Sequence, residues 1–96
     1  MNFQQKVYEI VSKIPAGKVM TYGQVAKLAG SPRAARAVGM CMSRNKDRNT
    51  VPCHRVVAAN GALTGYAFGD GVSTKRKLLL DEGVIFVDGR VNLQVI

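Results

Sequence analysis

Val51-Pro52-Cys53-His54-Arg55-Val56-Val57 sets the only histidine of the 96-residue chain directly beside one of its two cysteines. A thiol reacts as its thiolate, and an imidazole that takes the proton, directly or through one water, makes the sulfur a nucleophile. Cys53 is therefore the candidate nucleophile and His54 its candidate base. Pro52 fixes the backbone before the cysteine and Val56-Val57 predict a buried strand, so we expect the thiol at a loop-to-strand junction.

The same pair of residues has a structural interpretation that involves no chemistry. Adjacent residues on a strand point to opposite faces, so a buried cysteine beside a surface histidine gives the same pattern. Both interpretations of Cys53 and His54 stay open on this stretch alone.

Length and composition predict one soluble domain over residues 1–96. Hydrophobic residues make up 47% of the chain and charged residues 21%, and no apolar run approaches the roughly 20 residues that span a bilayer. No secretory leader opens the chain, so we expect a cytoplasmic protein with free thiols at Cys41 and Cys53. One histidine and two cysteines are too few for a zinc site of the usual composition, and we expect neither a metal nor a cofactor.

The net charge of +8 is concentrated in the first half of the chain. Residues 1–50 hold nine Lys or Arg against two acidic residues (+7), whereas residues 51–96 hold five against four (+1). A polyanion such as nucleic acid would therefore meet the first half. Simple solubility charge is the alternative explanation of the excess.

Two helices are predicted in the first 30 residues. The first is an amphipathic helix whose apolar residues recur at helical spacing, namely Phe3, Val7, Ile10, Val11 and Ile14. Val19-Met20 then reads as a short extended piece. Thr21 is a good N-cap for a second, short helix over Tyr22 to Leu28, and Gly30 ends that helix.

A third helix over residues 32–43 follows after a tight turn. Ser31 is placed to be its N-cap and Pro32 to be its first helical residue. Helix, tight turn and helix together give the spacing of a helix-turn-helix, with residues 32–43 in the place of the recognition helix.

This third helix has two unlike faces. One face is expected to meet the core, through Ala34, Val38, Cys41 and Met42. The remaining surface is nearly bare, because it carries Ala35, Ala37 and Gly39, and Arg33 and Arg36 stand at its edge. Such a surface suits close approach to another molecule, and a tight contact with another helix is the alternative.

The second half of the chain is predicted to hold turns, one helix and a hairpin. Asn60-Gly61 is a hairpin turn signal after the Val56-Val57 strand. Ser73 is expected to cap a helix that Gly83 ends, with Lys75-Arg76-Lys77 on a solvated face. The tail alternates around Asp88-Gly89 and predicts a β-hairpin.

Taken together, these motifs resemble the O6-alkylguanine-DNA alkyltransferases, the methylated-DNA:protein-cysteine methyltransferases. Pro-Cys-His-Arg-Val-Val is similar to the active-site motif of that family, and five further blocks follow the family's order: Thr21-Tyr22-Gly23-Gln24-Val25-Ala26, Ser31-Pro32-Arg33-Ala34-Ala35-Arg36-Ala37-Val38-Gly39, Arg44-Asn45, Gly65-Tyr66 and Leu78-Leu79-Leu80-Asp81-Glu82-Gly83. The match covers the family's C-terminal, DNA-binding and active-site domain. The chain also resembles the compact alkyltransferase-like damage sensors, which characteristically have Trp at the position of Cys53.

The resemblance implies a fold class and a set of catalytic residues. The fold is expected to be mostly α with short β elements, a single-domain, winged-helix or helix-turn-helix-like alkyltransferase domain. Glu82 is implied to orient His54, which activates Cys53. Tyr22 is implied to donate a proton to the departing guanine. Asn45 is implied to tie its turn to the backbone near the cysteine, with a left-handed Asn turn as the alternative.

The resemblance also implies how the family meets DNA. The third helix lies in the minor groove, and the residue matching Arg36 enters the base stack in place of the flipped nucleotide. The implied DNA-binding residues are Thr21, Tyr22, Ser31, Arg33, Ala34, Ala35, Arg36, Ala37 and Gly39. The implied pocket residues are Met42, Gly65, Tyr66 and Ala67. The loop after Tyr66 is about two residues longer than in familiar members, which affects the width of the pocket.

The function that the resemblance implies is direct reversal of O6-alkylguanine in double-stranded DNA, by one irreversible transfer of the alkyl group to Cys53 after base flipping. The protein is then a monomeric, single-turnover methyltransferase. The alternative is a non-enzymatic sensor that holds alkylguanine and recruits excision-repair proteins. A helix-turn-helix transcription regulator fits less well, because a regulator needs no Pro-Cys-His-Arg motif and usually dimerises.

Overall fold

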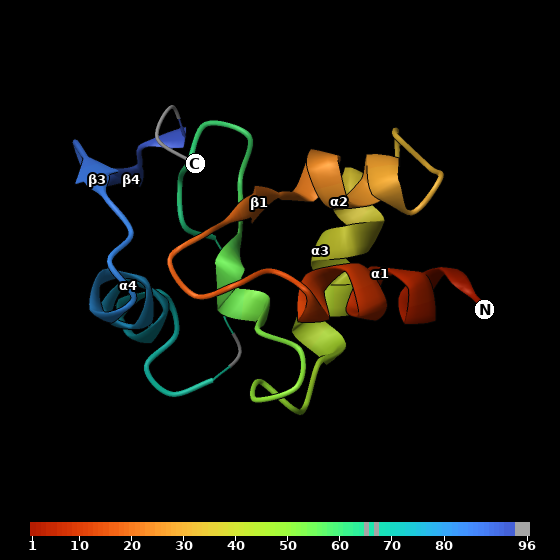
Figure 1. Cartoon of the computed structure of the whole chain (residues 1–96), viewed down its shortest axis with the longest axis horizontal. Coiled ribbons are helices and arrows are strands. Elements are labelled where there is room, and N and C mark those ends of the chain that lie inside the picture. The colour runs from red at the N-terminus through yellow and green to blue at the C-terminus, as the bar shows by residue number, and fades with distance from the viewer. Residues whose placement is uncertain (65, 67, 94–96) are drawn as a thin grey trace.

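Helices carry most of the fold, and short strands join them (Figure 1). The computed structural model describes residues 1–64, 66 and 68–93. Within these residues the elements follow the order α1 (Phe3–Ser12), β1 (Met20–Thr21), α2 (Tyr22–Leu28), α3 (Ala35–Arg44), the 3-10 turn η1 (Cys53–Arg55), β2 (Val56–Val57), α4 (Val72–Asp81), β3 (Phe86–Val87) and β4 (Arg90–Val91). The predicted fold class, mostly α with short β elements, is confirmed. No helix of the described residues is long and apolar enough to cross a membrane.

The helix α2 begins where the sequence predicts. The Thr21 hydroxyl accepts a hydrogen bond from the backbone N–H of Gln24 (3.1 Å), and the Gln24 side chain accepts one from the backbone N–H of Thr21 (2.8 Å). This capping box satisfies two N–H groups that a helix start leaves without partners. It also fixes the first residue of α2, Tyr22, directly after the strand β1.

The predicted start of α3 is wrong by three residues. Ser31 does not cap α3, whose N-cap is Ala34; the Ser31 N–H donates to Ala26 O (2.9 Å) and closes the end of α2. Ser31 O then accepts from Ala34 N (2.9 Å), so Pro32 occupies the second position of a tight turn instead of the first turn of a helix. The helix α3 begins at Ala35, and its N-cap Ala34 provides no side-chain hydrogen bond.

The Cys53 motif lies between the three N-terminal helices and α4 (Figure 1). The strand β2 pairs with β1 in parallel, with Met20 opposite Val56 and Thr21 opposite Val57. Val56 is buried in the core with α1, α2 and α3, whereas Val57 is buried in a second core with Leu79 of α4. The predicted buried strand is confirmed, and it joins the two halves of the fold.

The Asn60-Gly61 turn forms, but the strand before it makes no hairpin. Gly61 N donates to Ala58 O (2.9 Å), while β2 takes β1 as its partner. Gly61 has φ +82°, and a Cβ there would overlap the carbonyl oxygen of Val91. Val91 N also donates to Gly61 O (2.9 Å), so the turn holds the C-terminal strand β4.

The helix α4 starts two residues earlier than predicted and ends as predicted. Its N-cap is Gly71, not Ser73, and the nearby hydroxyl that bonds a backbone N–H belongs to Thr74, which accepts from Asp70 N (2.8 Å). Gly83, with φ +87°, ends the helix, and Val84 N donates to Leu79 O (3.0 Å) as helices closed by glycine do. The hairpin of β3 and β4 turns at Asp88-Gly89 as predicted, and residues 94–96 of the predicted tail lie outside the described residues.

Candidate active site and nucleic-acid interface

Local backbone geometry mounts Cys53 rigidly. Pro52 has φ −75° and ψ +72°, the conformation of an inverse γ-turn, and Cys53 N donates to Val51 O (2.8 Å). Arg55 N donates to Pro52 O (2.9 Å), which makes Cys53 the first residue of the 3-10 turn η1. The Cys53 side chain is buried, with 4% of its surface exposed. The expected loop-to-strand junction is present, with one helical turn between the proline and the strand.

Asn45 ties the end of α3 to this junction. Its side-chain amide donates to Val51 O (2.7 Å), and its side-chain oxygen accepts from Asp47 N (3.1 Å). The residue is buried and has φ −66°. The contact that the resemblance implied is therefore present, and the alternative of a left-handed Asn turn is wrong.

His54 is buried beside Glu82. The Nε2 atom of His54 lies 3.1 Å from Glu82 Oε2, and 6% of the His54 surface is exposed. The interpretation of His54 as a surface histidine is therefore wrong. Burial lowers the pKa of His54 more than Glu82 raises it, so the ring is neutral near pH 7. If Nε2 carries the proton that Glu82 accepts, Nδ1 keeps a lone pair, and Nδ1 is buried without a hydrogen-bond partner among the described residues.

Arg55 completes this cluster, and the sequence analysis missed it. Its Nε and Nη2 atoms donate to both oxygens of Glu82 (3.0 and 2.6 Å), and its Nη1 atom donates to Ile14 O (2.8 Å). Burial alone would raise the pKa of Glu82, but the hydrogen bonds from Arg55 and His54 lower it below its ordinary value. Glu82 is therefore a fixed anion near pH 7, as an acceptor for His54 needs to be.

Lys75 is buried, which corrects the prediction of a solvated Lys75-Arg76-Lys77 face. Its side chain is 1% exposed, and Nζ donates to Val56 O (2.7 Å) and Thr64 O (3.1 Å). Burial lowers the pKa of Lys75 from 10.5 to about 8. The signal that could have found it is helical spacing, because Lys75 precedes the buried Leu79 by four residues and so shares its face.

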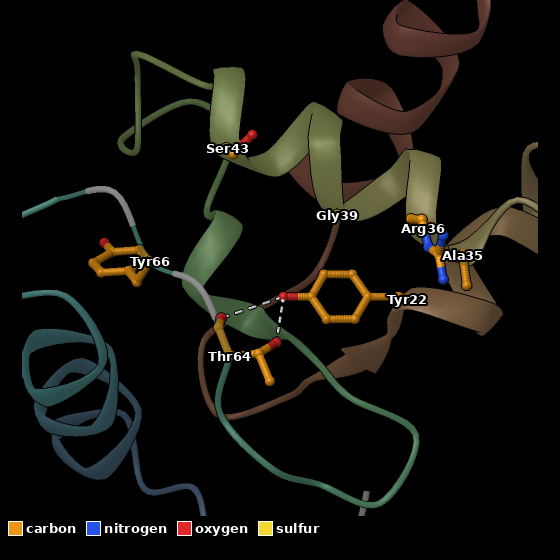
Figure 2. Close-up of a pocket in the computed structure, with 7 residues that line it drawn as sticks. All are labelled: Tyr22, Ala35, Arg36, Gly39, Ser43, Thr64 and Tyr66. Carbon is orange, nitrogen blue, oxygen red and sulfur yellow. Dashed lines mark hydrogen bonds between the residues drawn. The ribbon is translucent and has the colours of Figure 1, made fainter.

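A surface cavity of about 580 Å³ opens beside Tyr22 (Figure 2). It is lined by Tyr22, Ala35, Arg36, Gly39, Ser43, Thr64 and Tyr66. The Tyr22 hydroxyl lies 3.2 Å from Thr64 Oγ1 and 3.4 Å from Thr64 O. Burial raises the pKa of Tyr22 more than the hydrogen bond with Thr64 lowers it, so the phenol keeps its proton near pH 7.

The cavity brings together some of the residues that the sequence assigned to DNA and substrate, and separates others. Tyr22, Ala35, Arg36, Gly39 and Tyr66 line it, and the sequence analysis missed Ser43 and Thr64. Met42 is buried in the core and is not among the lining residues. Ala37 lies on another depression of the surface, with Asn2, Phe3, Gln4, Met40, Cys41 and Arg44.

The remaining predicted residues lie around the start of α2 and α3. Thr21 caps α2, and Ser31, Arg33 and Ala34 belong to the turn before α3. Gly65 and Ala67 lie outside the described residues.

Cys53 is within electrostatic reach of Tyr8, Tyr22, Tyr66 and Lys75. Burial raises the pKa of Tyr22 and of Tyr66 and lowers that of Lys75, and in all three cases charge on Cys53 acts to raise it. Coulomb interactions of this kind act over short distances in a protein.

Comparison with protein families matches residues 2–84 to the 6-O-methylguanine DNA methyltransferase, DNA binding domain. Over 81 residues the chain is 49% identical to the methylated-DNA–protein-cysteine methyltransferase of Methanosarcina acetivorans, covering 84% of this chain and 51% of that protein. It is 47% identical over 94 residues to the DNA base-flipping protein of Escherichia coli, covering 97% of this chain and 71% of that protein. The chain thus spans about half the length of the first relative and most of the second.

Solved structures of two related proteins have the same fold. S. pombe Atl1 in complex with damaged DNA containing O6-carboxymethylguanine aligns with a TM-score of 0.80 at 36% identity, covering 95% of this chain and 87% of that one. Mycobacterium tuberculosis OGT in complex with DNA aligns with a TM-score of 0.77 at 45% identity, covering 85% of this chain and 50% of that one. Sequence and structure agree that this chain belongs to the O6-methylguanine-DNA methyltransferase family and carries the family's DNA-binding domain.

Proposed function

We propose that the protein repairs O6-alkylguanine in double-stranded DNA by taking the alkyl group onto Cys53. The observation that carries the proposal is a buried cysteine followed by a buried, neutral histidine that an ionised glutamate holds at 3.1 Å. Covalent catalysis uses a nucleophile, a base that activates it and a group that orients the base, and Cys53, His54 and Glu82 fit these three roles. The relatives named methylated-DNA–protein-cysteine methyltransferase support the same reaction.

The first chemical step is loss of the Cys53 proton. Glu82 accepts a hydrogen bond from Nε2 of His54, so Nδ1 is the nitrogen that takes the thiol proton, directly or through one water. The imidazolium that results is stabilised by Glu82, whose two oxygens are held by Arg55. The buried ammonium of Lys75 adds a favourable charge for the thiolate.

The second step is displacement at the alkyl carbon. The Cys53 thiolate forms a carbon–sulfur bond while the bond from that carbon to O6 breaks and its electron pair passes to the guanine. The guanine gains a proton from the phenol of Tyr22. The phenolate then takes a proton from solvent and His54 releases to solvent the proton it took from Cys53, so the net change moves one proton from the thiol to guanine. A thioether has no good leaving group, so each protein molecule acts once.

The arrangement around α3 supports minor-groove docking. Ala35 and Gly39 leave the cavity side of α3 slim, and Arg36 projects next to them at the rim of the cavity (Figure 2). A slim helix with one cationic side chain fits a narrow groove and can replace a flipped base. The basic first half of the chain supplies phosphate contacts. One copy of α3 serves one lesion, and we therefore propose a monomer.

A transfer assay with a matched cysteine variant tests the proposal. Duplex carrying one O6-methylguanine is mixed with increasing amounts of protein, up to one molecule per lesion, and loss of the lesion is followed to completion. Wild type should remove the lesion in proportion to the protein supplied. Cys53→Ser should bind the lesion without removing it, because a hydroxyl is far less acidic than a thiol. Equal removal by Cys53→Ser would contradict the assignment of the nucleophile.

A sensor that holds the lesion without transferring the alkyl group is the second candidate, and two similar proteins favour it. The chain is 47% identical to the DNA base-flipping protein of Escherichia coli and 36% identical to S. pombe Atl1, whose structure is a complex with damaged DNA containing O6-carboxymethylguanine. In that case the protein holds the flipped base and recruits excision-repair proteins. Tight, selective binding by wild type with the methyl group still on guanine is the result that selects this candidate.

A further inference from the structure

We propose that Thr64 is a positioning residue for Tyr22, whose hydroxyl donates a hydrogen bond to the phenol oxygen as Tyr22 gives its proton to the departing guanine. The proposal rests on the alkyl transfer proposed above and adds a residue to it. Neither the motif nor its spacing points to Thr64, which comes 42 residues after Tyr22 in the chain. The cavity brings the two side chains together (Figure 2).

The contact between the two residues is direct and made twice. Tyr22 Oη lies 3.2 Å from Thr64 Oγ1, where either oxygen can be the donor, and 3.4 Å from Thr64 O. Figure 2 shows both contacts converging on the phenol oxygen from one side, with the ring lying under Gly39 of α3. An ideal Cβ at position 39 would lie 4.0 Å from the Tyr22 ring, so Gly39 and Thr64 bracket the side chain.

Thr64 is itself held from the opposite side. Its carbonyl accepts from Nζ of Lys75 (3.1 Å), and the same nitrogen donates to Val56 O in the strand β2 (2.7 Å). Lys75 is buried, and its Nζ lies 5.9 Å from the centroid of the Tyr22 ring. Lys75 thus links Thr64 to β2, the strand that follows Cys53. The same strand therefore helps to position both the Tyr22 phenol and the Cys53 thiol.

The donors and acceptors around the Tyr22 phenol oxygen determine the role of the Thr64 hydroxyl. A phenol has one proton, and once it points at the guanine the oxygen needs a donor to stabilise the negative charge that develops on it. The carbonyl of Thr64 can only accept. Within the part of the chain that the structure describes, the Thr64 hydroxyl is the hydrogen-bond partner of Tyr22 Oη that carries a proton to donate. The hydroxyl keeps its own proton throughout, so it orients and stabilises without joining the transfer.

Two substitutions separate the hydroxyl from the shape of the side chain. Thr64→Val keeps the branched shape and removes the hydroxyl, whereas Thr64→Ser keeps the hydroxyl and removes the methyl group. Single-turnover transfer from O6-methylguanine duplex should be about tenfold slower in Thr64→Val, the loss expected for one hydrogen bond, and Thr64→Ser should recover most of the rate. The affinity for duplex should be the same in both variants.

A double-mutant cycle shows whether the effect passes through Tyr22. In a Tyr22→Phe background, Thr64→Val should cause no further slowing, because the group it serves is gone. The same tenfold slowing with and without the Tyr22 hydroxyl would overturn the proposal, as would equal slowing in Thr64→Val and Thr64→Ser.

A titration tests the contact apart from transfer. The pKa of Tyr22, followed by NMR of tyrosine labelled with 13C at Cζ, should rise in Thr64→Val and stay at the wild-type value in Thr64→Ser, since the hydrogen bond to Thr64 lowers that pKa. An unchanged pKa in Thr64→Val contradicts the inference. If wild type transfers no methyl group, the proposed function is refuted, and so is the catalytic role of Thr64. The titration of Tyr22 still tests whether the hydrogen bond between Thr64 and Tyr22 exists.

Discussion

Replacing Lys75 with methionine should change how the stability of the protein depends on pH. The ammonium group is buried, its hydrogen-bond acceptors are the backbone carbonyls of Val56 and Thr64, and burial lowers its pKa from 10.5 to about 8. Methionine has a similar length and no charge. The substitution therefore removes the titration while it keeps most of the packing.

The direction follows from proton binding in the two states. Between pH 8 and 10.5 the unfolded chain keeps the Lys75 proton that the folded protein releases, so the free energy of unfolding rises with pH in this window. The whole difference corresponds to about 3 kcal/mol, of which about 2 kcal/mol appears between pH 7 and 9.5. Lys75→Met lacks this rise.

The assay is urea unfolding of wild type, Lys75→Met and the control Lys77→Met at pH 7 and pH 9.5. Lys77 lies on the same helix and is exposed. At pH 7 the relief of the buried charge in Lys75→Met is offset by the carbonyl of Val56, which loses its lysine donor at a cost of about 1–3 kcal/mol, whereas Thr64 O still accepts from the Tyr22 hydroxyl. At pH 9.5 the variant should be about 2 kcal/mol less stable relative to wild type than at pH 7. Cys41 and the tyrosines titrate in all three proteins, so their contributions to the free energy of unfolding cancel when each variant is compared with wild type. A Lys75→Met curve parallel to wild type would refute the reasoning, and Lys77→Met should be parallel.

Three further substitutions test the site. Arg36→Ala should weaken binding to damaged duplex and slow repair without changing the melting temperature, because Arg36 is exposed; a wild-type repair rate would show that it is not the inserted residue. Asn45→Ala should lower the free energy of unfolding by about 1–2 kcal/mol through loss of the bond to Val51 O, with the exposed Asn49→Ala as a neutral control in the same urea titration. Glu82→Gln should slow labelling of Cys53 by an alkylating probe and leave duplex affinity unchanged. Because the pKa of Glu82 is lowered in the folded protein, wild type should also lose stability as the pH falls below 4.5, and this loss should be smaller in Glu82→Gln. Labelling of Cys53 at the wild-type rate in Glu82→Gln would show that Glu82 does not help to activate the thiol.

The sequence predicts a helix end correctly where the residues of that one segment determine it. The N-cap at Thr21 and the glycine end at Gly83 depend on residues within four positions along the chain, and both form as predicted. The contact between His54 and Glu82 spans 28 residues and was reached only through the resemblance to a family. Asn45 and Val51 were reached in the same way.

Local signals failed where two segments compete or a distant segment supplies the partner. Ser31 is a good N-cap by residue type, but its carbonyl oxygen accepts from Ala34 N in a tight turn, so α3 begins only at Ala35. Lys75 looks solvated beside Arg76 and Lys77, yet carbonyls from β2 and from the loop at Thr64 bind its ammonium in the interior. Helical spacing from Leu79 places Lys75 on the buried face of α4, but no residue near Lys75 in the sequence indicates the two carbonyl groups that bind its ammonium.

The most direct test of the central claim is the mass of the protein after reaction with duplex carrying O6-methylguanine. The intact protein should gain one methyl group, peptide mapping should place it on Cys53 and not on Cys41, and an equal amount of guanine should be restored in the DNA. Binding of the duplex with no gain in protein mass, or a methyl group found on Cys41, would contradict the account.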